Sequence, residues 1–394
     1  MTFPVPRADP YTPPPEYRGP DGAALRWVSL AYGGAAWLVT GYEAARAVLA
    51  SSDFSSDPTL PGYPRFPLAP TRRMPGHFLS MDPPSHTRLR RLVASDFTAG
   101  GLNPLRPRIS ELARGLVAAM SRQGAPADLI ASLATPLPGL VAAAVLGVPS
   151  DDIPLFQAVA RDLQVHDATA ARRAAAVARG EGYLRQLIGS KRGAGPGPGG
   201  PDLLSRLVAG QDAASLTEAE IVGLANLLFV AGLETTGGLI GLTVLSLLRT
   251  PVAGDLVRAS PWRWSSLAVS EALRYWTVVH HGVARVAVRD ATVSGQPVRA
   301  GDAVVIHLPT ANRDPAVYPK PAVYDITRDA HAHLAFGHGV HRCLGATLAS
   351  TVAAGAVAEL LSQLPGLRLP ESAAEPPFLH HMLIYGLREL TVTW

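Results

Sequence analysis

The sequence predicts a mainly α protein with small β-sheets, folded as a single domain over residues 1–394. Helical patterns run from His86 to about Ile188, and the longest one spans Thr217–Leu248. Patterns typical of β-strands are confined to 25–40, 285–308 and 383–394. A length of 394 residues fits one large domain or two average ones, and the chain has no internal repeat.

The composition excludes several classes of protein. Hydrophobic residues make up 47% and charged residues 17% of the chain, which is unlike a disordered protein. The net charge of +4 comes without a dense basic stripe interleaved with aromatic residues, so we expect no nucleic-acid partner. The single cysteine rules out an intramolecular disulfide bond. Residues 1–16 lack a basic start followed by an apolar run, so we expect no signal peptide, no membrane anchor and a cytoplasmic protein.

The first elements are a hairpin, a short helix and a long loop. Leu25–Thr40 alternates in short apolar runs around Gly33 and Gly34, which predicts a β-hairpin. A short helix is expected over Glu43–Ala50. Pro58–Gly76 is dense in proline and glycine, and loops of such length in compact domains are usually functional or disordered.

The helical region that follows is interrupted at small residues. We expect breaks near Gly100-Gly101, Gln123-Gly124 and Gly147–Pro149. The Gly- and Pro-rich segment Lys191–Pro201 is interpreted as a flexible connector between helices rather than as a domain boundary.

Thr217–Leu248 predicts one long helix. Thr217 with Glu220 forms the pattern of a capping box, and Pro251 follows the far end. At 1.5 Å per residue the helix would extend about 50 Å, the width of a whole domain. A membrane span is the alternative, because Ile221–Leu233 is nearly all apolar, but Glu234 would place a carboxylate in the middle of the long helix, so we expect no membrane.

The C-terminal third switches to β patterns. Arg285–Leu308 reads as strands with turns at Ser294-Gly295 and Ala300–Asp302, and Leu383–Trp394 reads as short strands.

Cys343 carries the clearest chemical signal. It lies in Phe336–Gly345 (FGHGVHRCLG), between glycines and just before a helical pattern. Unpaired N–H groups and the dipole stabilise a thiolate at a helix N-terminus. Zinc would need more thiolates or several clustered ligands, whereas haem iron takes a single thiolate. A cysteine hydrolase is the other alternative, although His341 is too close in sequence to be the usual distant base.

This segment resembles the haem-binding loop of the cytochrome P-450 family, in which Phe, Gly, a basic residue, Cys and Gly occur at this spacing. The resemblance extends from about Asp9 to Trp394. Within the family, the chain is similar to soluble actinobacterial members that tailor natural products or oxidise foreign compounds. It implies the cytochrome P-450 fold, with the long helix over a haem b. Cys343 would then be the iron ligand, with Phe336 beside the sulfur, Gly345 closing the motif and His341 on a haem propionate.

A second motif, Glu271-Ala272-Leu273-Arg274, places opposite charges three residues apart on one helix face. In the family such a pair is buried and holds the side of the fold that carries the cysteine. The stretch Ala311–Pro315, which contains Arg313, together with Tyr324, Asp325 and Arg328, resembles the segment that meets this pair. We expect Glu271, Arg274 and Arg313 to be structural.

A third motif, Ala231–Thr236 (AGLETT), lies on the long helix. Glycine and threonine weaken a helix interior, and on its own the motif could be a packing seam of small residues. It resembles the family's oxygen-binding groove, where the helix opens locally at Ala231 and Gly232. The resemblance implies that Glu234 and Thr235 form the acid–alcohol pair that delivers protons, a general-acid role.

A fourth motif, Met81–Arg91, places His86 and Arg90 four residues apart on one helical face. Basic side chains suit propionates, whose charge needs donors in a buried pocket. By resemblance, His86 and Arg90 hold one haem carboxylate and Arg285 holds the other.

The substrate pocket is expected at segments that are largely apolar. By resemblance these are 61–78, 156–187, 229–233, 278–283 and 378–382. The chain departs from many relatives by having no proline shortly after the Glu-x-x-Arg helix and by having Leu233 where soluble bacterial relatives often have histidine. The residues expected to line the pocket are Phe229, Val230, Leu233, Val279, His280, His281 and His380, with His381 beside them.

The resemblance implies a monooxygenase that activates O2 to hydroxylate or epoxidise an apolar small molecule, such as a natural-product intermediate. Electrons would come from NAD(P)H through a ferredoxin reductase and a ferredoxin, because the chain has no flavin or Fe–S signature. Arg342, Arg88 and Arg91 could form a basic docking face for that ferredoxin. Alternatives are an oxidative coupling enzyme, a peroxide-driven oxidase, and a haem-thiolate protein that only binds a ligand.

Overall fold

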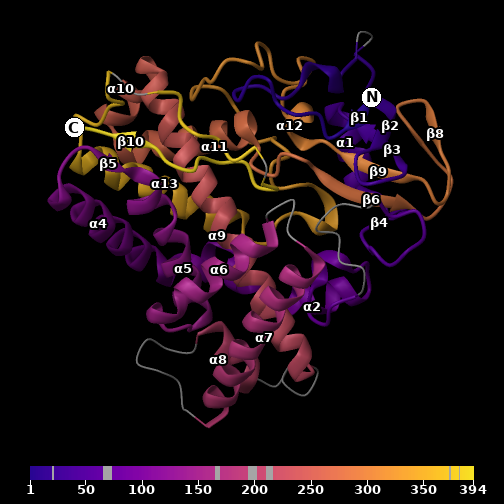
Figure 1. The fold of residues 1–394 in the computed structure, drawn as a ribbon, viewed down its shortest axis with the longest axis horizontal. Helices are drawn as coiled ribbons and strands as arrows, with labels where there is room; N and C mark the ends of the chain where they lie inside the picture. The colour runs from indigo at the N-terminus through magenta and orange to yellow at the C-terminus, as the bar shows by residue number, and fades with distance from the viewer. Residues whose placement is uncertain are drawn as a thin grey trace.

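The computed structural model describes residues 1–19, 22–64, 73–164, 169–193, 202–209, 216–371, 374–380 and 382–394. Parts of the predicted loop at 58–76 and of the connector at 191–201 lie outside the described residues, as does His381. Within the described residues helices dominate, and short strands form three small sheets. The predicted fold class is therefore confirmed. Figure 1 shows the largest sheet beside the N-terminus, with helices making up most of the remaining body.

The helices cover most of the chain after residue 85. They are α1 (Tyr42–Ala50), α2 (Ser85–Ala94), α3 (Ala99–Leu102), α4 (Arg106–Gln123), α5 (Pro136–Leu146), α6 (Ile153–Gln164), α7 (Ala170–Gly193), α8 (Leu203–Ala209), α9 (Glu218–Arg249), α10 (Pro251–Ala259), α11 (Pro261–Trp276), α12 (Leu308–Ala311) and α13 (Ala346–Gln363). Short tight turns of helix occur at 15–17, 78–80, 95–97, 103–105, 150–152 and 339–341, with one wide turn at 130–134.

The strands are β1 (Thr2–Phe3), β2 (Leu25–Leu30), β3 (Ala35–Val39), β4 (Phe54–Ser55), β5 (Ala127–Asp128), β6 (Val283–Ala287), β7 (Ala291–Val293), β8 (Gln296–Val298), β9 (Ala303–Ile306) and β10 (Thr391–Val392). The largest sheet has the order β1-β2-β3-β9-β6-β4, and β10-β5 and β7-β8 form two-stranded sheets.

The sheets form where the β patterns occur in the sequence. The predicted hairpin is β2 and β3, paired antiparallel with Leu25 opposite Val39. Ser294 and Gly295 both have positive φ, 48° and 79°, and make the turn between β7 and β8. Parallel pairing of β3 with β9 joins the N-terminal hairpin to the strands near residue 300. The predicted strands at the C-terminus are β10 and isolated bridges such as Val279 with Ile384.

The expected helix breaks occur in three different ways. At Gly100-Gly101 the chain makes the four-residue helix α3 between two tighter turns. Gly124 ends α4 with φ of 89°, and Gly147 ends α5 in the left-handed conformation with φ of 71°. These positive φ values favour glycine, because a side chain would be strained there.

The long helix is α9, and both of its ends follow the predicted signals. Thr217 accepts a hydrogen bond from the N–H of Glu220, whose side chain returns to the N–H of Thr217, so the capping box is complete. Pro251 opens α10 directly after α9 ends. Among the described residues, α9 is the one helix long and apolar enough to cross a membrane, but 61% of its most apolar window is buried in the protein. Such burial is typical of a core helix.

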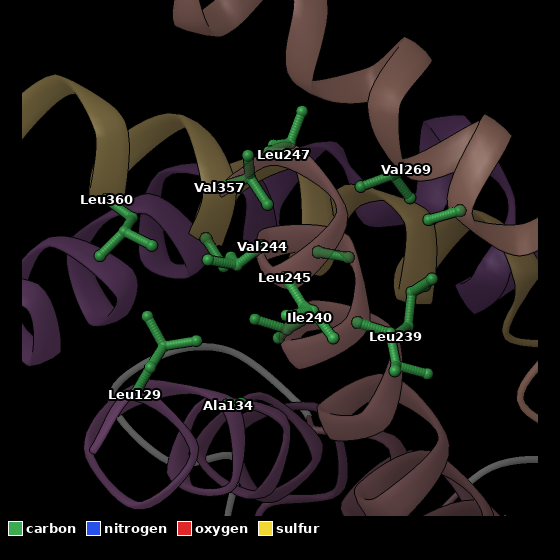
Figure 2. Packing of buried hydrophobic residues seen from close by; sticks show 14 of the residues in the cluster. Leu129, Ala134, Leu239, Ile240, Val244, Leu245, Leu247, Val269, Val357 and Leu360 are labelled. Atoms are coloured by element: carbon green, nitrogen blue, oxygen red, sulfur yellow. The ribbon is translucent and has the colours of Figure 1, made fainter. Parts of the chain in front are cut away.

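The largest apolar cluster surrounds the C-terminal half of α9. Figure 2 shows Ile240, Val244 and Leu245 of α9 near Val357 and Leu360 of α13. Leu129 and Ala134 approach from the segment before α5, and Val269 approaches from α11 (Figure 2). Gly237 and Gly238 let α9 approach other backbone, because an added Cβ would lie 2.9 Å from the Ala134 oxygen and 2.8 Å from the Tyr385 oxygen. Packing on several sides thus fixes the position of α9 in the core.

A buried ion pair anchors α11. Glu271 and Arg274 are both fully buried, and their charged atoms are 2.7 Å apart. Arg274 also donates to the carbonyl oxygens of Asn312, Pro321 and Val323 at 3.2, 2.9 and 3.2 Å. The N–H of Asp325 donates to Glu271 at 2.9 Å, and Arg328 lies 3.5 Å from it. The pair therefore lies in the core, where it contacts the backbone of residues 312–325.

Arg313 supports the same region without touching the pair through a hydrogen bond. It donates to the carbonyl oxygens of Tyr275 and Tyr11, each at 2.8 Å, and its guanidinium lies 4.0 Å from the centre of the Tyr275 ring. Arg313 thus ties α11 to the N-terminal segment.

Breaking the pair is expected to destabilise the protein strongly. Glu271→Ala leaves Arg274 charged and buried without its partner, so the free energy of unfolding should fall by about 3–5 kcal/mol. Urea unfolding followed by circular dichroism measures the change. Glu111→Ala is the control, because Glu111 and Arg108 form an exposed pair on α4 that should contribute less than about 1 kcal/mol. Equal effects of the two variants would contradict the structural role of Glu271.

Candidate functional site

A large cavity of about 1400 Å³ lies between α9 and the loop that carries Cys343. Its wall is mainly apolar and comes from α5, α7, α9, β6 and the start of α13. Of the predicted site residues, it is lined by Val230, Ala231, Gly232, Thr235, Val279, Arg285, Phe336, His341, Cys343 and Gly345. Residues far apart in the sequence thus meet around one space.

The cysteine loop is shaped by glycine. Gly337 and Gly339 have φ of 69° and 70°, and a Cβ at Gly339 would lie 2.4 Å from the carbonyl oxygen of Leu49. The N–H of Cys343 donates to the carbonyl oxygen of Phe336 at 2.8 Å. This bond folds the loop back on itself and presents Cys343 just before α13 begins at Ala346.

The Cys343 sulfur faces the cavity rather than bulk water. Cys343 counts as exposed by surface area, yet burial raises the pKa of its thiol. The two observations agree because the exposed surface belongs to the cavity wall. A hydrogen bond from the N–H of Gly345 and the positive charges of Arg90 and Arg342 act in the opposite direction and lower this pKa. The expected N–H stabilisation is therefore present, although burial has the larger effect on this pKa.

Three basic side chains beside the cavity have buried nitrogen atoms without hydrogen bonds to the described part of the chain. They are both ring nitrogens of His86, both ring nitrogens of His341, and Nη1 of Arg90. The two rings lie 4.3 Å apart between centroids. Burial first, and then Arg285, His86 and Arg90, lower the pKa of His341 to about 3. Leaving such groups unsatisfied costs about 1–3 kcal/mol each, so the arrangement favours an anionic ligand.

Arg285 and Arg90 are oriented by backbone carbonyls. Arg285 is 8% exposed, lines the cavity from β6 and donates to the Ala284 oxygen at 2.7 Å. Arg90 uses Nη2 to donate to the Arg342 oxygen at 2.7 Å, which links α2 to the cysteine loop. Together with the thiol, these donors fit a flat apolar group that carries carboxylates and a thiolate-binding metal, as a haem does.

The opposite wall belongs to α9. Thr235 lines the cavity, and its hydroxyl donates to the carbonyl oxygen of Ala231 at 2.7 Å. Nothing lies within 4 Å of a Cβ added to Gly232, so this part of the helix borders open space. The local opening of the helix that the family resemblance implied is not present, because α9 is an unbroken α-helix from Glu218 to Arg249.

Glu234 lies on a different side of α9 from the large cavity. It lines a small separate cavity of about 40 Å³, together with Thr135, Gln157 and Leu233. Burial raises the pKa of the Glu234 carboxyl, and Arg161 partly opposes this. The predicted acid and alcohol are therefore neighbours in sequence that border two different spaces.

Several residues predicted to line the substrate pocket do not border the large cavity. Phe229 is fully buried and stacks on Phe156, with ring centroids 4.1 Å apart, and Leu233 is packed in the same apolar cluster. The ring of His280 is buried, and its Nε2 donates to the Met382 oxygen at 2.5 Å. His281 stacks on His280, and His380 packs near Phe378 and Tyr385. Phe229 therefore packs against α6, and His280 and His380 pack against the C-terminal loop, instead of lining the large cavity.

Asn226 is a cavity residue that the sequence analysis missed. It lines the large cavity from α9 and is 4% exposed. The signal was available, because Asn226 is the one amide in the apolar run Ile221–Leu233. It also precedes Val230 by four residues, which puts the two on one helix face.

His307 and His280 form a buried neutral pair. His307 donates from Nε2 to the His280 oxygen at 2.9 Å, while its Nδ1 accepts from Thr310. Burial above all, with Arg7 and His281 nearby, holds the pKa of both rings well below the ordinary 6.5. Both rings therefore stay uncharged in the folded protein.

The chain resembles known proteins over its whole length. A family model described as Cytochrome P450 matches residues 266–385. The chain is 41% identical to pentalenic acid synthase of Streptomyces avermitilis, over 100% of this chain and 97% of that protein. It is also 41% identical to the cytochrome P450 monooxygenase PikC of Streptomyces venezuelae, over 98% and 91%. The crystal structure of CYP105P1 in complex with filipin I has a TM-score of 0.91 at 35% identity, over 100% of this chain and 98% of that chain.

The buried histidine pair predicts acid sensitivity. Below about pH 6.5 the two histidines take up protons in the unfolded chain, whereas His280 and His307 stay neutral in the folded protein. The free energy of unfolding therefore falls as the pH falls. Each ring should contribute a loss of up to about 1.4 kcal/mol per pH unit. His307→Asn should therefore flatten the fall in unfolding free energy between pH 6.5 and 5, whereas exposed His331→Asn should not. Parallel curves for the wild type and His307→Asn would argue against this origin.

Proposed function

The chain belongs to the cytochrome P450 family, and from this premise we propose that it hydroxylates or epoxidises an apolar natural-product intermediate with electrons from a ferredoxin. As a P450 monooxygenase it is an oxidoreductase that uses haem, O2 and electrons delivered by redox partners. One observation carries the proposal for this chain: Cys343 and three residues of α9, Ala231, Gly232 and Thr235, border the same large apolar cavity.

The proposed haem site consists of residues around the cysteine. Cys343 is the proposed iron ligand, with Phe336 beside the sulfur and Gly345 leaving room at the start of α13. The unpartnered nitrogens of His86, Arg90 and His341, together with Arg285, support a propionate-binding role. Thiolate-bound haem supplies electron density that favours cleavage of the O–O bond.

The proposed proton path uses both neighbours on α9. Thr235 can turn its hydroxyl from the Ala231 oxygen toward the large cavity and donate there. Glu234, with its raised pKa, holds a proton closer to neutral pH than an ordinary carboxyl and borders the small cavity with Thr135 and Gln157. The proposed role of Glu234 is to resupply the proton that Thr235 gives up, as a general acid.

The proposed substrate class follows from the cavity wall, and the proposed electron donor follows from exposed arginines. The cavity wall is mainly apolar, and the relatives make or modify natural products such as pentalenic acid. Arg342 is exposed in the cysteine loop and Arg91 is exposed on α2, which supports docking of an acidic ferredoxin. Arg88 does not fit this role, because it pairs with Glu220 at the start of α9. We expect the enzyme to act in the cytoplasm, where ferredoxin and its NAD(P)H-dependent reductase are available.

Isotope labelling tests the reaction. A library of natural-product scaffolds is first screened for a low-spin to high-spin shift of the Soret band. A hit is then incubated with NADPH, ferredoxin, ferredoxin reductase and ¹⁸O2, and the expected product gains one ¹⁸O atom. A product that loses hydrogen without gaining oxygen would indicate coupling. Full turnover with peroxide alone, without the redox partners, would indicate a peroxide-driven oxidase, and binding without product would indicate a ligand-binding protein.

Removing one propionate donor should loosen the haem. His341→Leu removes a hydrogen bond to a charged group, so transfer of haem to apomyoglobin should become about 10- to 100-fold faster. The apoprotein should be no less stable, because the variant also removes two buried unsatisfied nitrogens. Exposed His331→Leu is the control, and unchanged haem retention in His341→Leu would contradict the assigned role.

Thr235 is expected to control how much of the consumed NADPH yields product. Thr235→Ala removes the hydroxyl that donates at the cavity wall, so product formation should fall by about 100-fold, the scale of one general acid. Thr235→Ser keeps the hydroxyl and should retain most of the product yield. If both variants behave alike, the lost methyl group rather than the hydroxyl explains the effect, and the proposed role is wrong.

A further inference from the structure

Asn226 stands out in the wall of the large cavity because it is a polar residue in an apolar setting. It is 4% exposed and lies on α9 beside Leu224, Ala225 and Leu227, which belong to one apolar cluster. Its neighbours toward the cysteine side, Val230 and Ala231, line the same cavity. An amide at this position needs a physical reason.

The Asn226 amide makes no hydrogen bond with the described part of the chain, and its Oδ1 is buried without a partner. Two other buried polar side chains of α9 are satisfied within the helix. Thr243 donates to the Leu239 oxygen at 2.6 Å, and Ser246 donates to the Leu242 oxygen at 2.8 Å. An unsatisfied buried amide costs its desolvation energy, so Asn226 weakens the protein unless a bound molecule completes its hydrogen bonds.

Gly180 on α7 packs closely over the amide. A Cβ at Gly180 would lie 3.1 Å from Oδ1 of Asn226 and 3.6 Å from Val159 of α6. The amide therefore sits in a slot between α9 and two covering helices. The last side-chain torsion of asparagine is soft, so the amide can present either its oxygen or its NH2 group to the cavity.

The chemistry of the slot favours an uncharged group. Asparagine offers no charge to compensate an ion in an apolar wall. The nearby cavity residue Glu181 is already paired with Arg185 at 2.8 Å. A hydroxyl group both donates and accepts, so it can bind the amide in either of its orientations.

The position along α9 sets a distance. Asn226 precedes Thr235 by nine residues, which corresponds to an axial separation of about 13 Å at 1.5 Å per residue. The two residues lie on different faces of the helix, so their backbone atoms are at least this far apart. A ligand that reaches both must be large.

We propose that Asn226 is a specificity-determining residue that binds a hydroxyl of an otherwise apolar substrate, remote from the carbon oxidised beside Thr235, which lies about 13 Å further along the α9 axis. The inference rests on the proposed function and names the substrate class: extended or polycyclic apolar skeletons with a hydroxyl at the end remote from the reacting carbon.

Chain-length probes test this distance in the holoenzyme. 1-Alkylimidazoles coordinate haem iron through nitrogen and trail their chains into the cavity, and each is compared with the analogue whose chain ends in a hydroxyl. Binding is measured from the Soret shift of nitrogen coordination, over chains that span shorter and longer distances than the proposed one. In the wild type, the terminal hydroxyl should weaken binding for short chains. At the chain length that reaches Asn226, it should improve the Kd by about tenfold relative to the methyl-terminated probe.

Variants at the same position separate recognition from structure. Asn226→Leu should abolish the preference for the hydroxyl and leave the melting temperature of the probe-free holoenzyme equal or higher, because an unsatisfied amide is removed. Asn226→Ser should keep part of the preference. Leu228→Met, at a neighbouring cavity position, is the control and should keep all of it.

The outcomes are distinct. A wild type that never prefers the hydroxyl, or an Asn226→Leu variant that keeps the preference, overturns the proposal. So does a lower melting temperature of Asn226→Leu, because Asn226 would then be structural. All preparations must first show the thiolate-type spectrum of the reduced carbonyl complex, so failure of the proposed function would appear as its absence before any probe is added.

Discussion

The site depends on one constraint: nitrogen donors are buried around a thiol without acceptors of their own. His86, His341 and Arg90 have buried nitrogens with no hydrogen bond to the described chain. His341 lies in the loop that carries Cys343, and His86 and Arg90 contact that loop from α2. Burying such groups opposes folding, and burial also raises the pKa of the thiol. A bound haem would reverse both costs, since its propionates would accept hydrogen bonds from the buried nitrogens and its iron would bind the thiolate. The pocket therefore has the polar groups of a binding site whose hydrogen bonds only a ligand can complete.

Hydrogen bonds from the core hold the cysteine loop in place. The buried pair Glu271 and Arg274 fixes the backbone at Asn312 through the 3.2 Å bond from Arg274. The Asn312 side chain in turn accepts from the N–H of Leu334 at 2.6 Å, two residues before Phe336. Phe336 then accepts from the N–H of Cys343. These hydrogen bonds, together with the backbone from Leu334 to Phe336, thus connect α11 to the cysteine.

Local signals in the sequence predicted much of this architecture. The capping box at Thr217, the hairpin around Gly33 and the glycine-rich cysteine loop each depend on neighbouring residues, and each forms as expected. The orientation of α9 could not be predicted in the same way. Apart from Asn226, Ile221–Leu233 is apolar on every side of the helix, so the pattern does not reveal that Phe229 and Leu233 pack in an apolar cluster rather than line the large cavity. His280 was likewise misjudged, because only the folded chain brings the Met382 carbonyl to its ring.

The central claim is that the Cys343 thiolate binds haem iron, and the carbonyl complex of the reduced protein tests it most directly. The purified wild type is expected to be coloured and, after dithionite reduction and addition of CO, to show the long-wavelength Soret band that only thiolate ligation produces. Cys343→Ser should lose that band. A colourless wild type, or a freshly reduced carbonyl complex without the thiolate band, would contradict the account.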